Sequence, residues 1–430
     1  MAGQVHDLVS YLFREQAGKI NAALLNLFGF NNLQLVEDVI QETFIAAYQK
    51  WPYSGIPDDP AAWLIVTARN KAVNELKRGA KITFSDNSAF IANIEQHAEQ
   101  QIEHSFSEKE IVDSQLKLLF LCCHPQLRPK AQVILTLQVL CGFSLEEIAS
   151  AMLMRKEAVK KTLLRTKQEI REKQLYIHTT YTFLSDTRAE AVLQVLYLMF
   201  NEGYKTTEDK ELVNKDLCYE AIRLCKLLLR LKSKESDINA LLALMFFNIA
   251  RFPARSGESG EIVLLQDQDR HKWDRRFIDE AFYYLERSRN TQTLTRYHLE
   301  AGIASAHCSS KSYGETDWKI IVYYYDKLMA LNPSPIVSIN RAIAIAELNG
   351  ADKGLQELNS LSTYPGVTAY YLYPAAKGEL LLRLKQYREA IPLFRSASDL
   401  TKSTFNKNLL SSRIEYCITK LNDHAHELLQ

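Results

Sequence analysis

The chain has 430 residues, of which 47% are hydrophobic, so it can bury the cores of two to four domains. It contains 52 Lys and Arg residues and 51 Asp and Glu residues. The resulting formal net charge of +1 excludes a polycation that coats nucleic acid with its whole surface. No window approaches about 18 uninterrupted apolar residues, and the first residues lack the pattern of a signal peptide, so we expect no contact with a membrane.

The cysteines and the small number of Gly and Pro residues limit the possible fold classes. Seven cysteines, an odd number, lie within apolar helical patterns, which favours reduced thiols and a cytoplasmic protein over a disulfide framework. No segment alternates polar and apolar residues over the length of a strand with hairpin signals beside it. The sequence therefore predicts an all-α protein.

Two amphipathic helices are expected over residues 4–30 and 33–51. The apolar face of the second helix holds Leu35, Val36, Val39, Ile40, Phe44 and Ala47. Four polar residues lie on its opposite face: Glu37, Asp38, Gln41 and Glu42. A turn-rich loop at 52–60 follows, and Pro60 is expected to begin a third helix.

The later part of this third helix is basic. Residues 69–81 carry five Lys and Arg residues against one Glu, a local charge of +4. Asn70 and Asn74 are four residues apart and share one face, and Trp63 lies near the helix start. An acidic connector follows, because residues 82–115 hold seven carboxylates against one Lys and few apolar residues. We assign residues 81–110 to a flexible linker, with helices resuming at 111–123, 129–141, 144–153 and 157–173.

Residues 143–170 have the pattern of a helix-turn-helix. Ser144 and Glu147 form a potential capping box for a short first helix, and the turn after it is only three or four residues long. Val159, Leu163 and Leu164 are expected to form the apolar face of the second helix. Residues 154–173 contain eight basic residues and three acidic ones, a local charge of +5. Such a charge suits a helix that enters the major groove of DNA. The alternative is a solvated basic face without a partner.

After about residue 176 the helices become longer, more apolar and rich in Tyr. We expect a helical domain at 176–290 and a second one at 291–430. In the latter, similar segments place Trp318, Gly354 and Ala390 in register at steps of 36 residues. Helix pairs of about 34 residues are typical of tetratricopeptide (TPR) repeats, so a TPR-like solenoid is predicted; an irregular helical domain is the alternative.

Three short motifs contain residue types that also occur in ligand or catalytic sites. Cys122, Cys123 and His124 favour core packing over a metal site, because structural zinc needs four converging ligands. In "FNEGY", Gly203 is expected to end a helix in the left-handed conformation, and a ligand or interdomain contact is the alternative. The stretch "QDQDR" at 266–270 has no partnered His or nucleophile, so we expect neither an enzyme active site nor a cofactor.

The sequence resembles the extracytoplasmic-function (ECF) class of bacterial sigma-70 factors. The segments that carry the resemblance are "VEDVIQETFIAAYQKW", "DPAAWLIVTARNKAVNELKR" and "FSLEEIASAMLMRKEAVKKTLLRTKQEIRE". They are similar to sigma region 2.2, regions 2.3–2.4 and region 4.2. "LQVLYLMFNEGY", "LLQDQDRHKWDR" and residues 317–350 resemble one ECF subgroup, which carries a domain of unknown function and TPR-like helices after region 4. The resemblance assigns residues 1–80 to region 2 and residues 111–175 to region 4.

The resemblance implies a role for three sets of residues. The set expected to bind the β′ clamp of core RNA polymerase is Glu37, Asp38, Gln41, Glu42 and Phe44. The set expected at the −10 promoter element is Trp63, Arg69, Asn70, Asn74, Lys77 and Arg78. The set expected at the −35 element is Arg155, Lys156, Lys160, Lys161, Thr162, Arg165 and Lys167. The implied partners are core polymerase, through its β′ clamp and β flap, promoter DNA, and a regulatory protein or ligand at the C-terminal extension.

Two other functions remain compatible with the residues themselves. A helix-turn-helix regulator with a TPR-like sensor domain would bind duplex DNA without polymerase. A TPR-type scaffold would bind neither DNA nor polymerase, and its basic helices would only be solvated surface. The sigma factor is the preferred hypothesis, with the extension in place of a separate anti-sigma factor.

Overall fold

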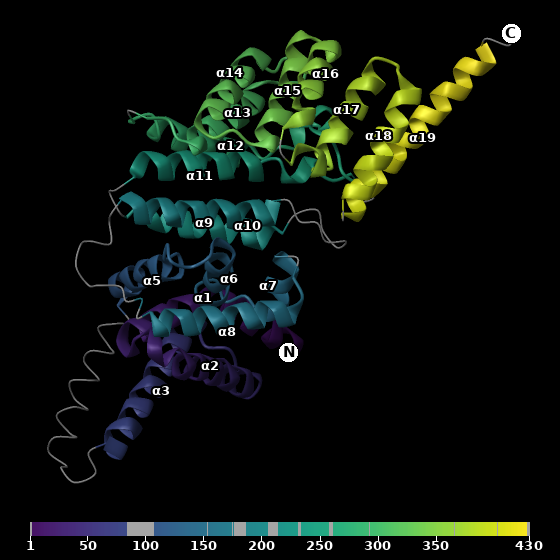
Figure 1. Ribbon diagram of the computed structural model, residues 1–430. Coiled ribbons are helices and arrows are strands. Elements are labelled where there is room, and N and C mark those ends of the chain that lie inside the picture. Colours follow the sequence, from purple (N-terminus) through teal and green to yellow (C-terminus); the bar gives the residue numbers. More distant parts are fainter. Residues whose placement is uncertain are drawn as a thin grey trace. The chain divides into compact units, whose positions relative to one another are not determined.

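The computed structural model describes residues 2–83, 107–152, 154–173, 175, 186–204, 214–230, 234–257, 261–291, 293–364, 366–401 and 403–427 (Figure 1). Most of these residues are helical and none of them lies in a strand; one isolated bridge joins Ser256 and Ile262. The predicted all-α class is therefore confirmed. The chain divides into two compact units at Met199 and Phe200, called unit 1 and unit 2 below. None of the helices in the described ranges has the length and apolar character that a membrane crossing requires.

Unit 1 begins with three helices: α1 (Ala2–Phe28), α2 (Leu33–Ser54) and α3 (Pro60–Thr83), with a short 3₁₀ turn, η1 (Phe30–Asn32), before α2. Gly55 ends α2 with a φ of 83°, a conformation that side chains with a Cβ rarely adopt. The Asp59 carboxylate accepts a hydrogen bond from the Ala62 N–H at 2.9 Å and so caps α3, which begins at Pro60 as predicted. The basic stretch at 69–81 is thus the second half of one long helix.

Four helices follow: α5 (Glu108–Cys122), α6 (Pro129–Val139), α7 (Leu145–Ala151) and α8 (Lys156–Glu172). Their bounds agree with the predicted ones to within a few residues. The main difference is α5, which begins inside the acidic stretch that we assigned to the connector. Ser107 accepts a hydrogen bond from the Glu110 N–H and caps α5, which explains the early start. Residues 84–106, most of the predicted linker, lie outside the described residues.

Helix α1 packs directly against the end of α6, so the two predicted DNA-binding domains meet within unit 1. The Asn21 side-chain amide donates a buried hydrogen bond of 2.9 Å to the Val139 carbonyl. Gly18 lies against the Leu140 carbonyl so closely that a Cβ at this position would be 1.9 Å from the oxygen. Lys117 of α5 also donates to the Asn26 side chain at 3.2 Å. The two basic helices, α3 and α8, therefore belong to one compact unit in this structure.

Helix α9 (Asp186–Tyr204) ends in unit 2, which continues with α10 (Lys215–Leu228), α11 (Glu235–Ile249), α12 (Arg275–Arg287) and α13 (Arg296–Ser309). Nearly every residue of α11 is buried, so this helix is the centre of the core. Gly203 does not end α9 in the left-handed conformation, which corrects our prediction. It is helical, and a Cβ there would lie 2.9 Å from the Asn214 carbonyl oxygen, so close packing is what the position requires.

Six helices complete unit 2: α14 (Trp318–Leu331), α15 (Pro335–Asn349), α16 (Ala351–Ser360), α17 (Leu372–Arg383), α18 (Tyr387–Leu400) and α19 (Thr404–Glu427). Each helix packs on the next one along the chain (Figure 1). Small residues permit close contacts: a Cβ on Gly354 would be 2.3 Å from the Ala346 Cβ, and one on Gly378 would be 2.7 Å from the Phe394 ring. Trp318, Gly354 and Ala390, the residues in register in the sequence, lie in α14, α16 and α18, and the TPR-like solenoid itself stays a prediction.

Candidate nucleic-acid interface

Helices α7 and α8 form the predicted helix-turn-helix. The Ser144 N–H donates to the Glu147 carboxylate at 2.8 Å, and the Glu147 N–H donates to the Ser144 hydroxyl at 3.1 Å, which confirms the capping box. α7 ends at Ala151 and α8 begins at Lys156, so a short turn joins them. Helix α8 is anchored by four buried side chains: Val159, Leu163, Thr166 and Ile170. Their spacing of four, three and four residues is that of one helix face.

The opposite face of α8 is exposed and basic. Lys160, Lys161 and Arg165 are all exposed, and they surround Leu164. The predicted place of Leu164 on the apolar face beside Leu163 is wrong, because Leu163 is 3% exposed and Leu164 is 60% exposed. Adjacent residues on an α-helix are about 100° apart, so both cannot face one narrow core. Leu164 is therefore an apolar side chain in the middle of a cationic surface.

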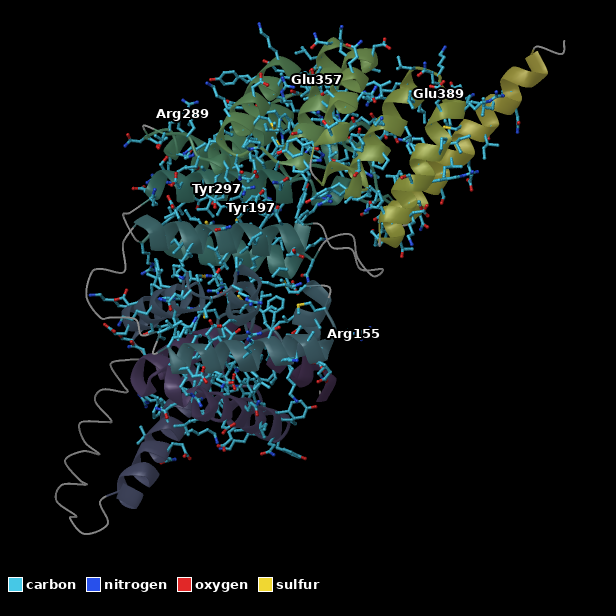
Figure 2. All side chains as sticks on the ribbon, in the orientation of Figure 1. Arg155, Tyr197, Arg289, Tyr297, Glu357 and Glu389 are labelled. Atoms are coloured by element: carbon cyan, nitrogen blue, oxygen red, sulfur yellow. The ribbon has the colours of Figure 1, made fainter. Side chains whose placement is uncertain are left out.

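The first turn of α8 is held by contacts to α7 and within the helix. Arg155, the residue before the first turn, is exposed (Figure 2). Lys156 forms an ion pair with Glu146, and this hydrogen bond raises the pKa of Lys156 and lowers the pKa of Glu146. The Thr162 hydroxyl donates to the Ala158 carbonyl at 2.8 Å. Arg155 is thus the more available of the two basic residues at the start of α8.

The residues predicted for the −10 element lie along α3. Asn70 and Asn74 are both exposed, and Arg69 is partly exposed. Trp63 packs edge to face against Trp51, with ring centroids 5.4 Å apart, and the 2% exposure of Trp51 makes it a buried anchor for this contact. Lys77 and Arg78 belong to α3, but their side chains lie outside the described residues.

The residues predicted to bind polymerase are divided between surface and core. Asp38 and Gln41 are exposed on α2, and Glu42 accepts an ion pair from Lys71 of α3 at 2.8 Å. Phe44 differs from the rest because it is 6% exposed and packs edge to face on Phe13, with centroids 4.8 Å apart. In this conformation Phe44 supports α2 from the core side and does not present its ring to solvent.

One contact joins two of the predicted binding sets. Lys167 of α8 donates to the Glu37 carboxylate of α2 at 2.7 Å, and both side chains are largely buried, with exposed fractions of 18% and 23%. Lys167 belongs to the predicted −35 set and Glu37 to the predicted polymerase set. The two charges neutralise each other in this structure, and neither side chain is available to an external partner.

The packing of α1 on α6 can be tested at Gly18. Gly18→Ala should add about 1 kcal/mol of helix propensity to α1, yet its Cβ has no room against the Leu140 carbonyl. We therefore expect α6 to lose contact with α1, and backbone amide exchange near Val139 to become at least tenfold faster. Gly314→Ala is the matched control, because a Cβ there meets nothing within 4 Å. Unchanged exchange near Val139 in the Gly18 variant would contradict this packing.

The motif at Cys122–His124 belongs to the core of unit 1. Cys122 and Cys123 are 0% and 1% exposed, and burial raises the pKa of the Cys123 thiol to about 12. All seven cysteines are buried and free. Within the described ranges no three His, Cys, Asp or Glu side chains come together as a metal site would need.

Three segments of the chain match known protein families. Residues 12–82 match sigma-70 region 2, and residues 117–170 match sigma-70 region 4. Residues 188–289 match a family of unknown function (DUF6596). The first match includes α2 and α3, and the second ends within α8, so the helices described above are those of a sigma factor.

The resemblance extends along most of the chain. An uncharacterized protein of Rhizobium meliloti (strain 1021) is 32% identical over 387 residues, which is 90% of this chain and 91% of that protein. No solved structure matches. The chain belongs to the ECF class of sigma-70 factors, in the subgroup with a C-terminal helical extension. It is a sigma factor for transcription initiation.

Proposed function

We propose that this chain binds core RNA polymerase through the exposed face of α2 and directs it to promoters with two separated elements. In this proposal the protein acts in the cytoplasm. It binds polymerase and promoter DNA, captures a base of the −10 element and is later released, and it catalyses no covalent step. The observation that carries the proposal is the exposed cationic face of α8, opposite a buried anchor, in a chain that also contains region 2.

The α8 face is suited to the −35 element. Lys160, Lys161 and Arg165 supply positive charge for phosphates and base edges in the major groove. Leu164 lies between them and offers an apolar contact of the kind that distinguishes thymine, through its methyl group, from other bases. We therefore add Leu164 to the proposed −35 set, which the sequence alone had omitted.

The α3 face is suited to the −10 element. Asn70 and Asn74 present amide groups on one exposed stretch, and an amide can form two hydrogen bonds to the edge of an adenine. Capturing a base requires its removal from the stack, which costs a few kcal/mol. Tyr53, 92% exposed in the last turn of α2, offers an aromatic surface that stacks on such a base and offsets this cost.

The compact form of unit 1 fits a resting state in this account. Glu37 and Lys167 cannot serve polymerase and DNA while they pair with each other. Binding to polymerase would have to separate α8 from α2, and the extension in unit 2 is proposed to influence that step. The motivating observation for the extension is its size, a helical unit from Phe200 onward.

Binding to polymerase can be tested at Asp38. The full-length chain, labelled with a fluorophore, should bind purified core polymerase, and Asp38→Lys should weaken this binding at least tenfold because it reverses a charge on the proposed contact face. Asp399→Lys makes the same charge change on an exposed residue of α18 and should have no effect. Full affinity of the Asp38 variant, with normal helical content, would count against α2 as the polymerase contact.

A further inference from the structure

The segment "QDQDRHKW" of unit 2 holds an arginine whose hydrogen bonds are only partly satisfied. Arg270 donates from Nη1 to the carbonyls of His307 and Ser310, at 2.6 and 2.7 Å, and from Nη2 to the Thr316 hydroxyl at 3.0 Å. Its Nε is buried and has no acceptor among the described residues. Three N–H groups of Arg270 therefore donate to the protein, while its Nε–H has no acceptor within the described ranges.

A second arginine lies against the same indole ring. The Cζ atoms of Arg251 and Arg270 are 5.4 and 5.0 Å from the centroid of the Trp273 ring. Arg251 donates only from Nε, to the Gln268 side chain at a long 3.4 Å, and its Nη groups have no acceptor within the described part of the chain. Both arginine side chains are partly exposed, so an ion can approach them from solvent.

The charge of this pair is not neutralised by a carboxylate. Other arginines of unit 2 have one: Arg341 pairs with Asp326 and Glu357, and Arg413 pairs with Glu379. Neither Arg251 nor Arg270 has a carboxylate within ion-pair distance among the described residues. Burial lowers the pKa of Arg270, and the charge of Arg251 lowers it further. Glu315 is near enough to raise the pKa of Arg270 but forms no ion pair with it, so the two like charges share a site without a directly paired counterion among the described residues.

Two further polar atoms beside the pair also lack partners. Trp273 Nε1 and His307 Nδ1 are buried, with their residues 3% and 8% exposed, and neither forms a hydrogen bond to a described residue. Burial, together with the charges of Arg251 and Arg270, lowers the pKa of His307 to about 3, so the ring is neutral near pH 7. An unsatisfied buried donor is destabilising, and several in one cluster require an explanation.

We propose that Arg251 and Arg270, with Trp273 and His307 beside them, bind the oxyanion group of a small molecule, either a carboxylate or a phosphate. Guanidinium groups recognise both through paired N–H donors of fixed geometry. Ordered water would satisfy the orphaned atoms, but it would not neutralise the two charges, whereas an anion does both. The site lies wholly in unit 2, so it gives the extension a ligand-binding role that does not depend on the promoter contacts.

Occupancy of this site should stabilise unit 2. Arg251 follows α11, Arg270 and Trp273 lie before α12, and His307 is near the end of α13, so one ion would bridge three segments. A ligand that binds only the folded state raises its stability in proportion to the logarithm of ligand concentration. Binding is therefore expected to appear both as heat of association and as a raised melting temperature.

The test is isothermal titration of the full-length chain, in low-chloride buffer, with inorganic phosphate, pyrophosphate and succinate in separate experiments. We expect saturable 1:1 binding of at least one of these anions, and the comparison of phosphates with succinate separates the two ligand classes. Arg251→Gln should weaken that binding at least tenfold. Arg289→Gln removes an equal charge from an exposed residue of unit 2 that pairs with Glu286 (Figure 2), and it should bind as the wild type does.

Arg251→Gln is chosen because Arg251 makes a single long hydrogen bond, so its loss should leave the fold intact. Arg270→Lys is the second variant: it keeps the charge and removes the paired donors, and it should also weaken binding. The proposal is overturned if none of the three anions binds saturably, or if Arg251→Gln and Arg289→Gln bind them equally well. Because the measurement needs neither polymerase nor promoter DNA, its failure would leave the sigma-factor assignment untouched.

Discussion

Replacing Lys160 and Lys161 together with alanine is expected to reduce promoter binding by the polymerase complex by about 10- to 100-fold. Both side chains are exposed on the face of α8 opposite its buried anchor, and alanine keeps the helix intact. If each lysine meets a phosphate, the slope of log affinity against log salt concentration should fall by about two in total. Affinity should be measured by titration of promoter DNA at several salt concentrations.

The control for this prediction changes the net charge equally at a distance from α8. Lys311 and Lys319 are both exposed in unit 2, and their double alanine variant should bind promoter DNA with unaltered affinity and salt dependence. Equal losses in the two double variants would mean that overall charge, and not the α8 face, governs binding. An unchanged salt slope in the Lys160 and Lys161 variant would remove both residues from the proposed phosphate contacts.

Phe394→Ala is expected to destabilise unit 2 by about 3–5 kcal/mol. The side chain is 0% exposed and packs with Leu381 and Leu410, and its ring fills the space that Gly378 leaves open. Truncation removes the ring from this cluster and leaves a cavity, because the helix backbones on either side can close only partly. Amide hydrogen exchange of α17 and α18 should become faster by at least two powers of ten.

Leu400→Ala is the matched control within the same helix. Leu400 is 42% exposed, so its truncation should change stability by less than about 0.5 kcal/mol and leave exchange in α17 unaltered. If Phe394→Ala behaved like Leu400→Ala, the contact of Phe394 with Gly378 could not be part of the native core.

The helices of unit 1 were predictable because local patterns determine them. Pro60 begins α3, Ser144 and Glu147 form the capping box, and the apolar spacing of α2 matches its buried face. Capping and periodicity need only neighbouring residues, so they can be read directly from the sequence. The prediction failed at Leu164, because only its angular position on α8 distinguishes this exposed residue from the buried Leu163 beside it.

The contact between Glu37 and Lys167 could not be predicted from the sequence. These residues are 130 positions apart, and nothing local to either one indicates that α2 and α8 meet. Gly18 carried a weak signal, because a glycine within a helix often marks a close approach, yet the partner at Leu140 depends on the tertiary fold. The individual helices of unit 1 were therefore predictable from the sequence, and their mutual arrangement was not.

The same limit applies to the segment at 266–270 of unit 2. From the sequence alone we expected no active site at this segment, and its spacing gave no sign of the contacts that it makes: the Gln266 side chain accepts a hydrogen bond from Arg383, and the Gln268 side chain accepts one from Arg251. The arginine pair over Trp273 arises because Arg251 is brought to the segment by the end of α11. A cluster assembled from distant residues leaves no spacing pattern for sequence analysis to detect.

Run-off transcription with purified core polymerase and the full-length chain tests the central claim most directly. On a library of promoter fragments, we predict transcripts that begin downstream of paired −35 and −10 elements and that disappear when either element is replaced. The chain alone should not select those fragments. Specific binding to the same DNA without polymerase, together with the absence of any initiated transcript, would contradict the sigma-factor account and identify a polymerase-independent regulator.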